Sequence, residues 1–217
     1  LTVDITYDGN AWAPTNAGSY TVTGVVADVN YEGMATGTLV VAKATPTVTA
    51  WPTASALVYG QALSNSVLSG GSASAPGSFA FTAPATKPPV GTANQSVTFT
   101  PADAANYNTV TGTVSVTVTR APAVVTLHNL NQTYNGSPRV VTAATVPSGL
   151  AVALTYNGSA AAPVNAGTYT VVGLVTDPNY QGGATGTLTV AKAAQTITFP
   201  AIPRQTSDAG HSSAARQ

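Results

Sequence analysis

Two stretches of this chain decide its fold. Residues 156–193 read YNGSAAAPVNAGTYTVVGLVTDPNYQGGATGTLTVAKA, and residues 7–44 read YDGNAWAPTNAGSYTVTGVVADVNYEGMATGTLVVAKA. They align without a gap, and about two in three aligned positions are identical. Self-similarity at one fixed offset is the signature of a chain built from repeated structural units. The sequence therefore predicts two copies of one unit.

A divergent third copy of the same ending lies between them. Each ending has an Asp, then Asn-Tyr, then Thr-Gly-Thr, and closes on a basic residue followed by alanine: Lys43-Ala44, Arg120-Ala121 and Lys192-Ala193. These closures predict four segments. Residues 1–44 are the C-terminal part of a unit whose beginning is missing, 45–120 and 121–193 are complete units, and 194–217 start a further unit and then become a polar tail.

The period of the apolar residues predicts strands. Val114, Val116 and Val118 alternate with polar residues, as in a strand that buries one face. Breaks rich in Pro, Gly and Asn recur every 8 to 15 residues or so, which is typical of short strands in a sandwich. We expect an all-β fold of tandem small antiparallel β-sandwich (Ig-like) units. Units of the β-grasp type are the alternative, but they need a helix that the sequence does not predict.

The Asp-Asn-Tyr group of each ending has a physical reason. Asp and Asn side chains can accept hydrogen bonds from main-chain groups two residues on, which forms a turn. The Tyr that follows can lay its ring on the core and direct its hydroxyl to a main-chain carbonyl, as in a tyrosine corner. The predicted structural turn and corner residues are Asp28, Asn30, Tyr31, Asp103, Asn106, Tyr107, Asp177, Asn179 and Tyr180.

The same residues carry a resemblance to known families. Residues 1–44 and 121–193 resemble the MBG/YDG-type repeats of large bacterial surface proteins and fibrillar adhesins, through Tyr7-Asp8-Gly9, Tyr156-Asn157-Gly158 and the Asn-Ala-Gly and Ala-Thr-Gly-Thr-Leu motifs. Residues 45–120 resemble a bacterial immunoglobulin-like repeat, through Trp51-Pro52-Thr53 and Tyr59-Gly60-Gln61. The resemblance implies surface stalks or spacers, and it implies no catalytic residue.

Composition narrows the classes of function. Only 6% of residues are charged, with 7 basic against 7 acidic side chains, and cysteine is absent. Nucleic-acid binding needs a basic stripe, so it is not expected, and no apolar run is long enough to insert into a membrane. Thr, Ser, Asn and Gly take the place of charge at the surface. We expect an extracellular or bacterial cell-surface location.

Catalytic, metal and cofactor sites are not predicted. The two histidines, His128 and His211, have no partner that would orient a base. Calcium needs several oxygen ligands from one short loop, and only Asp28 and Glu32 among the acids are close in sequence. Lys43 and Lys192 are candidates by residue type for an internal Lys–Asn cross-link, although a lysine in a linker is the simpler interpretation.

The leading hypothesis is a non-enzymatic structural stalk or spacer of a bacterial extracellular adhesin or surface protein. Its expected partners are neighbouring repeats of the same chain. One alternative is a carbohydrate- or protein-binding module that uses Trp12, which the sister unit replaces with Ala161. A glycan or host protein would then be the partner. Another alternative is a homo-oligomer or filament in which strand exchange between copies completes the first unit.

Overall fold

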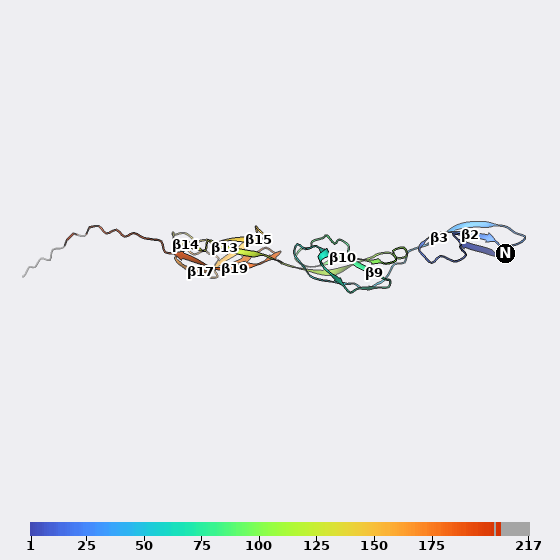
Figure 1. The fold of residues 1–217 in the computed structure, drawn as a ribbon, viewed down its shortest axis with the longest axis horizontal. Coiled ribbons are helices and arrows are strands. Elements are labelled where there is room, and N and C mark those ends of the chain that lie inside the picture. Colours follow the sequence, from blue (N-terminus) through green and yellow to red (C-terminus); the bar gives the residue numbers. More distant parts are fainter. Residues whose placement is uncertain (202, 205–217) are drawn as a thin grey trace, which may run out of the picture.

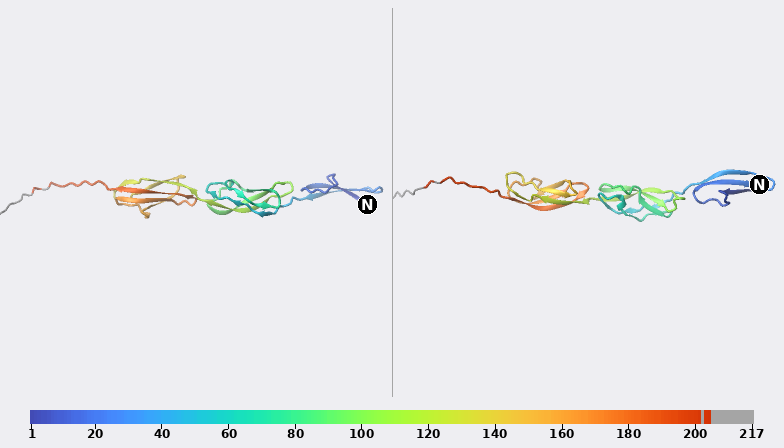
Figure 2. Two further views of the ribbon diagram at one scale, coloured as in Figure 1. Left: turned by 60° about the horizontal axis from the view of Figure 1, so that its bottom comes forward. Right: turned by 45° about the horizontal axis from the view of Figure 1, so that its top comes forward.

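The computed structural model describes residues 1–201, 203 and 204. Within these residues the chain is all-β, with one short 3-10 turn at Leu63–Asn65 as its only helical element. Figures 1 and 2 show the sheets in a row along one axis, in the order in which they occur in the chain. We call residues 1–44 the first unit, 45–120 the middle unit and 121–193 the third unit; their exact boundaries stay predictions.

The third unit is a sandwich of a four-stranded sheet and a two-stranded one. The larger sheet has the order β14-β19-β17-β16, and β13 pairs with β15 in the smaller. Its strands are β12 (Ala121–Pro122), β13 (Val124–His128), β14 (Asn131–Thr133), β15 (Thr142–Val146), β16 (Val152–Tyr156), β17 (Gly167–Val175), β18 (Tyr180–Gln181) and β19 (Gly183–Ala191). Between the sheets lie the buried side chains of Val141, Tyr156, Val171, Leu188 and Val190.

The middle unit repeats this plan with a different sequence. Its larger sheet has the order β6-β11-β10-β9, and two short pairs, β4-β8 and β5-β7, lie outside that sheet. Its strands are β4 (Val48–Ala50), β5 (Thr53–Ala54), β6 (Leu57–Val58), β7 (Leu68–Ser69), β8 (Ser72–Ala73), β9 (Gly77–Phe81), β10 (Gly91–Pro101) and β11 (Val110–Thr119). The core contains Leu57, Leu63, Phe81, Val97, Val114, Val116 and Val118.

The sheets are not purely antiparallel, which differs from the sequence expectation. In the third unit β14 runs parallel to β19, and in the middle unit β6 runs parallel to β11. In both units the opening segment first pairs antiparallel, with β15 or β8, and then crosses to the other sheet. The parallel pairing arises because the first and last strands of a unit both run from the end where the chain enters to the end where it leaves.

The first unit contains only half of this plan. Its strands β1 (Val3–Tyr7), β2 (Gly18–Val26) and β3 (Met34–Val41) form an antiparallel sheet of the order β1-β2-β3, which matches β16-β17-β19 of the third unit. No segment of the part of the chain that the structure describes covers the apolar face of this sheet, so none of its hydrophobic residues is buried and Val3 and Ile5 are each 50% exposed. Residues 194–201, beyond the third unit, contain no strand.

The glycine of each Thr-Gly-Thr motif has no side chain and so leaves a recess in the face of a sheet. In the middle unit a Cβ on Gly112 would overlap the ring of Trp51, and in the third unit a Cβ on Gly186 would meet Leu127 and Leu130 methyl groups at 3.3 Å. In the first unit Gly37 has nothing within 4 Å of that position. The recess is therefore filled by the segment that covers the sheet, and it is open where that segment is absent.

Candidate functional site at the unit junctions

Groups that could support catalysis or bind a metal are dispersed. Among residues 1–201, 203 and 204, no three His, Asp or Glu side chains lie close enough to share an ion. Asp28 and Glu32 belong to one exposed loop, and His128 ends β13. His211 and Asp208 lie outside the described residues. The described part of the chain also contains no helix with the length and apolarity to span a bilayer.

In all three Asp-Asn-Tyr loops the Asp carboxylate accepts the main-chain N–H of the Asn, and the first and third units share the same two-residue spacing. The Asp28 carboxylate accepts the main-chain N–H of Asn30 at 2.8 Å, and that of Asp177 accepts the N–H of Asn179 at 2.8 Å. In the middle unit, where the spacing is one residue longer, Asp103 accepts the N–H of Asn106 at 3.1 Å. Each loop lies just before the last long strand of its unit, at the end where the chain enters.

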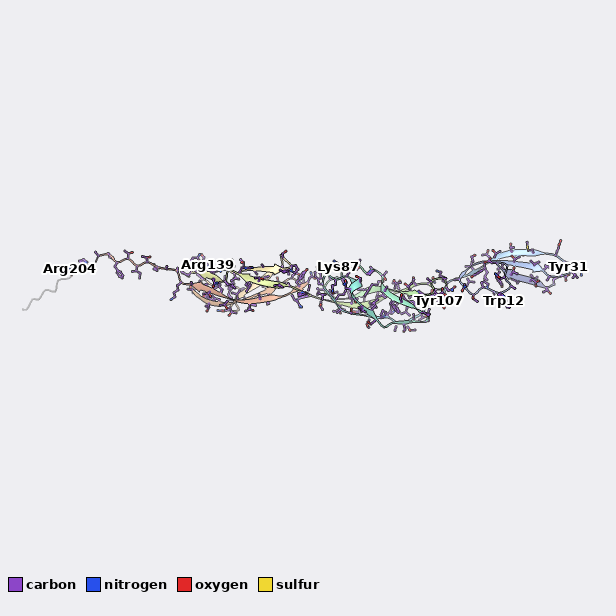
Figure 3. The ribbon with its side chains drawn as sticks, viewed as in Figure 1. Trp12, Tyr31, Lys87, Tyr107, Arg139 and Arg204 are labelled. Atoms are coloured by element: carbon purple, nitrogen blue, oxygen red, sulfur yellow. The ribbon has the colours of Figure 1, made fainter. Side chains whose placement is uncertain are left out.

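The tyrosines of these loops do not have the predicted hydroxyl partner. Among the described residues, the hydroxyls that reach a main-chain carbonyl four residues back belong to Tyr20, which bonds Asn16 at 2.8 Å, and Tyr169, which bonds Asn165 at 2.9 Å. Tyr31 is instead 63% exposed. The reason is its position, since Tyr31 lies at the outer end of the first unit and not against a core (Figure 3).

At the first junction the middle unit contacts the first through Asn106. Its side-chain oxygen accepts the main-chain N–H of Ala17 at 2.7 Å, and its side-chain nitrogen donates to the Asn16 side chain at 3.2 Å. The same nitrogen donates to Asp103 at 2.7 Å, which orients the amide. Figure 3 shows Tyr107, the next residue, at the end of the middle unit that faces the first. One side chain thus joins two units.

Main-chain bonds and a lysine complete this junction. The N–H of Ala44 donates to the Asn106 carbonyl at 2.9 Å, and the carbonyl of Ala44 accepts the N–H of Asn108 at 2.8 Å. The Lys43 ammonium group donates to the Ala104 carbonyl at 2.7 Å, where it also acts on the nearby Asp103. The Asn106 side chain, main-chain N–H groups and the Lys43 charge together hold the pKa of the Asp103 carboxyl below its ordinary value.

The second junction uses the same main-chain pairing with a different side-chain contact. Ala121, the equivalent of Ala44, is the linker residue that opens the third unit; it donates to the Asn179 carbonyl at 2.9 Å, and β12 pairs in parallel with β18 of the same unit. Here the side-chain contact is aromatic. The rings of Tyr59 and Tyr180 meet edge to face, with centroids 5.5 Å apart and planes at 77°. The Asp-Asn-Tyr loop is therefore the part of a unit that binds its predecessor.

Sequence reasoning missed the other half of each junction. It singled out the loops but not Asn16, Ala17 and Tyr59, which receive them. For Asn16 and Ala17 the sequence contained a signal, because the Asn-Ala-Gly motif recurs at 165–167. The Asn and Ala side chains of this motif are not buried, so packing in a core does not explain why it is repeated. No comparable signal marks Tyr59, because tyrosine is common in strands of any sandwich.

Trp12, the predicted ligand contact, lies at a shallow cavity of about 260 Å³ on the first unit. The indole is 87% exposed, and Tyr7, Asp8, Asn10, Pro14 and Tyr20 line the same cavity. In the third unit the tyrosine equivalent to Tyr7 is Tyr156, which is 5% exposed because it packs in the core, where its hydroxyl accepts the N–H of Val141 at 3.0 Å. The first unit has no such cover.

Fold and junctions define a class, an all-β chain of successive Ig-like units joined end to end by loop contacts. The family model for the MBG domain matches residues 1–45 and 123–194. These segments make up more than half of the chain, which therefore belongs to the MBG domain family. The middle unit lies outside the matched segments, so its resemblance to a bacterial immunoglobulin-like repeat stays a prediction.

Solved structures with some similarity include multidomain segments of a cadherin and of a protein with Ig domains. Drosophila N-cadherin EC1-4 is 11% identical with a TM-score of 0.36, and the match covers 82% of this chain and 58% of that one. The N-terminal four Ig domains of Dscam1 isoform 8.4 are 13% identical with a TM-score of 0.35, and the match covers 81% and 55%. This chain thus spans little more than half of either. No curated protein sequence matches it.

Proposed function

We propose that this chain is a non-enzymatic spacer of an extracellular adhesin or surface protein, in which the junctions hold successive units in line. Membership of the MBG domain family supports an extracellular or surface setting, in agreement with the resemblance of residues 7–44 and 156–193 to surface-protein repeats. A spacer acts by keeping a fixed length. Its function therefore depends on the stiffness of its junctions and not on a reactive group.

The observation that carries this proposal is the shared main-chain pairing at both junctions. Ala44 pairs in parallel with Tyr107, and Ala121 pairs in parallel with Tyr180. Each linker alanine is thus hydrogen-bonded to the loop of the following unit, which leaves no free linker between the sheets. Linkers that bend freely are rich in unpaired Gly or Ser. Low charge also means that electrostatic repulsion contributes little to the extension.

Small-angle X-ray scattering of the full chain tests stiffness directly. The spacer function predicts one maximum dimension, which stays the same between low and high salt, because the junctions consist of short hydrogen bonds and ring contacts. A matched chain with four glycines inserted after Ala44 should show a shorter mean dimension and a broader distribution. If the unmodified chain is already as broadly distributed as the glycine variant, the spacer proposal fails.

A second candidate function has one observation in its favour. The exposed indole of Trp12 and the rings of Tyr7 and Tyr20 line one cavity beside the polar Asp8 and Asn10, a combination that can stack on a sugar ring. A glycan array with the full chain tests it, and Trp12→Ala is the matched variant because Ala161 occupies this position in the sister unit. Equal signals from both chains would reject a glycan site at Trp12.

A further inference from the structure

The C-terminal end of the third unit has an open cavity, and its lining residues take part in neither of the two junctions described above. It has a volume of about 310 Å³ and is lined by Tyr134, Asn165, Ala166, Lys192, Ala193 and Gln195. Four of these residues have exact sequence equivalents in the first unit, in the same order and at the same offset: Asn16, Ala17, Lys43 and Ala44. Those four are the residues that bind the middle unit.

The equivalent surface of the first unit is occupied in this structure. Ala17 donates its main-chain N–H to the Asn106 side chain, Lys43 donates to the Ala104 carbonyl, and Ala44 pairs with the same loop. The loop that fills it has the sequence Asp-Ala-Ala-Asn-Tyr at 103–107. The cavity on the third unit is therefore the vacant form of a surface whose occupied form is visible elsewhere in the same chain.

The vacant surface is already shaped for this loop. The Tyr169 hydroxyl bonds the Asn165 carbonyl at 2.9 Å, just as Tyr20 bonds Asn16 at 2.8 Å, so the Asn-Ala turn is held in the same way. Among the described residues no acceptor pairs with the N–H of Ala166, whereas that of Ala17 has Asn106. A half-buried N–H without an acceptor is a favourable position for an incoming carbonyl oxygen.

Tyr134 corresponds in position to Tyr59, whose ring makes the aromatic contact at the second junction. It follows β14 and donates its N–H to the Ala191 carbonyl at 2.8 Å, and Tyr59 follows β6 and donates to the Thr119 carbonyl at 2.9 Å. The two tyrosines thus occupy the same place in their units. Tyr59 packs on the ring of Tyr180 in the next unit. Tyr134, which is 40% exposed, presents an aromatic ring for the tyrosine of an incoming loop.

The loop that fits is the one with three residues between Asp and Tyr. In the Asp177 loop, where the spacing is shorter, the Asn179 side chain makes no hydrogen bond among the described residues, and only its main chain bonds the linker residue Ala121. In the Asp103 loop the Asn106 side chain crosses the junction. A surface on which the Ala166 N–H and the Asn165 side chain have no partner among residues 1–201, 203 and 204 matches the second kind of loop.

We infer that the C-terminal end of the third unit is a socket for an Ig-like unit of the 45–120 type. Its Asn would bind Ala166 and Asn165, its Tyr would pack on Tyr134, and Lys192 would cap the loop. The inference rests on the proposed spacer function and extends it, because it makes the two kinds of unit alternate through matched ends. The partner is defined by its Asp-x-x-Asn-Tyr loop.

The test is a chain of residues 1–193 followed by a second copy of residues 45–120. The readout is amide hydrogen exchange at Ala166, with Ala17 of the same molecule as the internal standard. In the unmodified chain Ala17 should be protected and Ala166 should not. In the extended chain the exchange at Ala166 should slow by about tenfold or more and approach that at Ala17.

Two variants of the extended chain identify the contact. Asn106→Ala in the added copy should return Ala166 to fast exchange, whereas Asn94→Ala in the added copy, an exposed strand position with no hydrogen bond of its side chain, should not. If the first variant fails to fold, Asn165→Ala on the socket side serves instead, because the Asn165 side chain bonds nothing among the described residues and only its carbonyl is used.

The outcomes distinguish failure of the socket from failure of the spacer function. Fast exchange at Ala166 in the extended chain, together with a protected Ala17, would overturn the socket and leave the spacer function intact. Fast exchange at both Ala17 and Ala166 would show that the first junction does not form, and the spacer function would then fail as well. Slow exchange at Ala166 that survives both Asn106→Ala and Asn165→Ala would also overturn the inference, because the protection would then come from another contact.

Discussion

Replacing Asn106 with alanine removes the side chain that makes two hydrogen bonds between the first and middle units, where Lys43 and Asn108 make one each. Two hydrogen bonds across the junction are lost, one to the Ala17 N–H at 2.7 Å and one to the Asn16 side chain at 3.2 Å. Each contributes about 0.5–1.5 kcal/mol net, so the closed junction should lose about 1–3 kcal/mol. That free energy lowers the ratio of closed to open junctions by a factor of about 5–150.

The units themselves should stay folded. The main-chain bonds of Ala44 with Asn106 and Asn108 do not depend on the lost side chain, and Asn106 is not part of the middle core. Because the chain has no cysteine, one label can be placed on each unit at Thr36→Cys and Lys87→Cys, both exposed positions. Double electron–electron resonance between spin labels then reports the distance distribution, which should broaden in Asn106→Ala.

Two matched substitutions separate the junction from a general effect of removing an amide. Asn94→Ala changes an exposed strand residue, and Asn179→Ala changes the loop residue of the second junction whose main chain, and not its side chain, bonds the linker residue Ala121. Neither should broaden the distribution between the first and middle units. A distance distribution in Asn106→Ala as narrow as that of the parent would refute the assignment of Asn106 as the joining residue.

Three further predictions follow from the same geometry. Tyr156→Phe removes the acceptor of a buried main-chain N–H, so the third unit should lose about 1–3 kcal/mol in hydrogen-exchange opening, whereas Tyr7→Phe, which lacks that partner, should change little. Since the folded-state pKa of Asp103 is lowered, the stability that its carboxylate gives to the first junction is present at neutral pH and is lost as the pH falls below about 4. The distribution of label distances should therefore broaden below about pH 4 and stay constant between about pH 6 and 8. Asp103→Asn should remove this broadening at low pH. Gly112→Ala places a methyl group where the ring of Trp51 lies, so it should lower the free energy of unfolding of the middle unit by about 1–3 kcal/mol in denaturant titration. Gly37→Ala adds its methyl group where no atom lies within 4 Å and should be close to neutral.

Much of the fold could be predicted from the sequence because its signals are local. The alternation at Val114, Val116 and Val118 becomes β11, and all three side chains are buried. Alternation along a strand is imposed by neighbouring residues, and so it can be recognised without knowing what the strand packs on.

The junctions could not be predicted in this way. Asn16 and Asn106 are 90 residues apart, and their contact depends on the direction in which one unit follows another. The hydroxyl bond assigned to the loop tyrosines belongs instead to Tyr20 and Tyr169, because the loops lie at the ends of the units, at a junction or at the outer end, and not against a core (Figure 3). The sequence by itself determined the repeats, the strands and the turn residues, because these follow from residue spacing. Only the tertiary structure decided which residues meet between units, because that contact is set by how whole sheets are placed end to end.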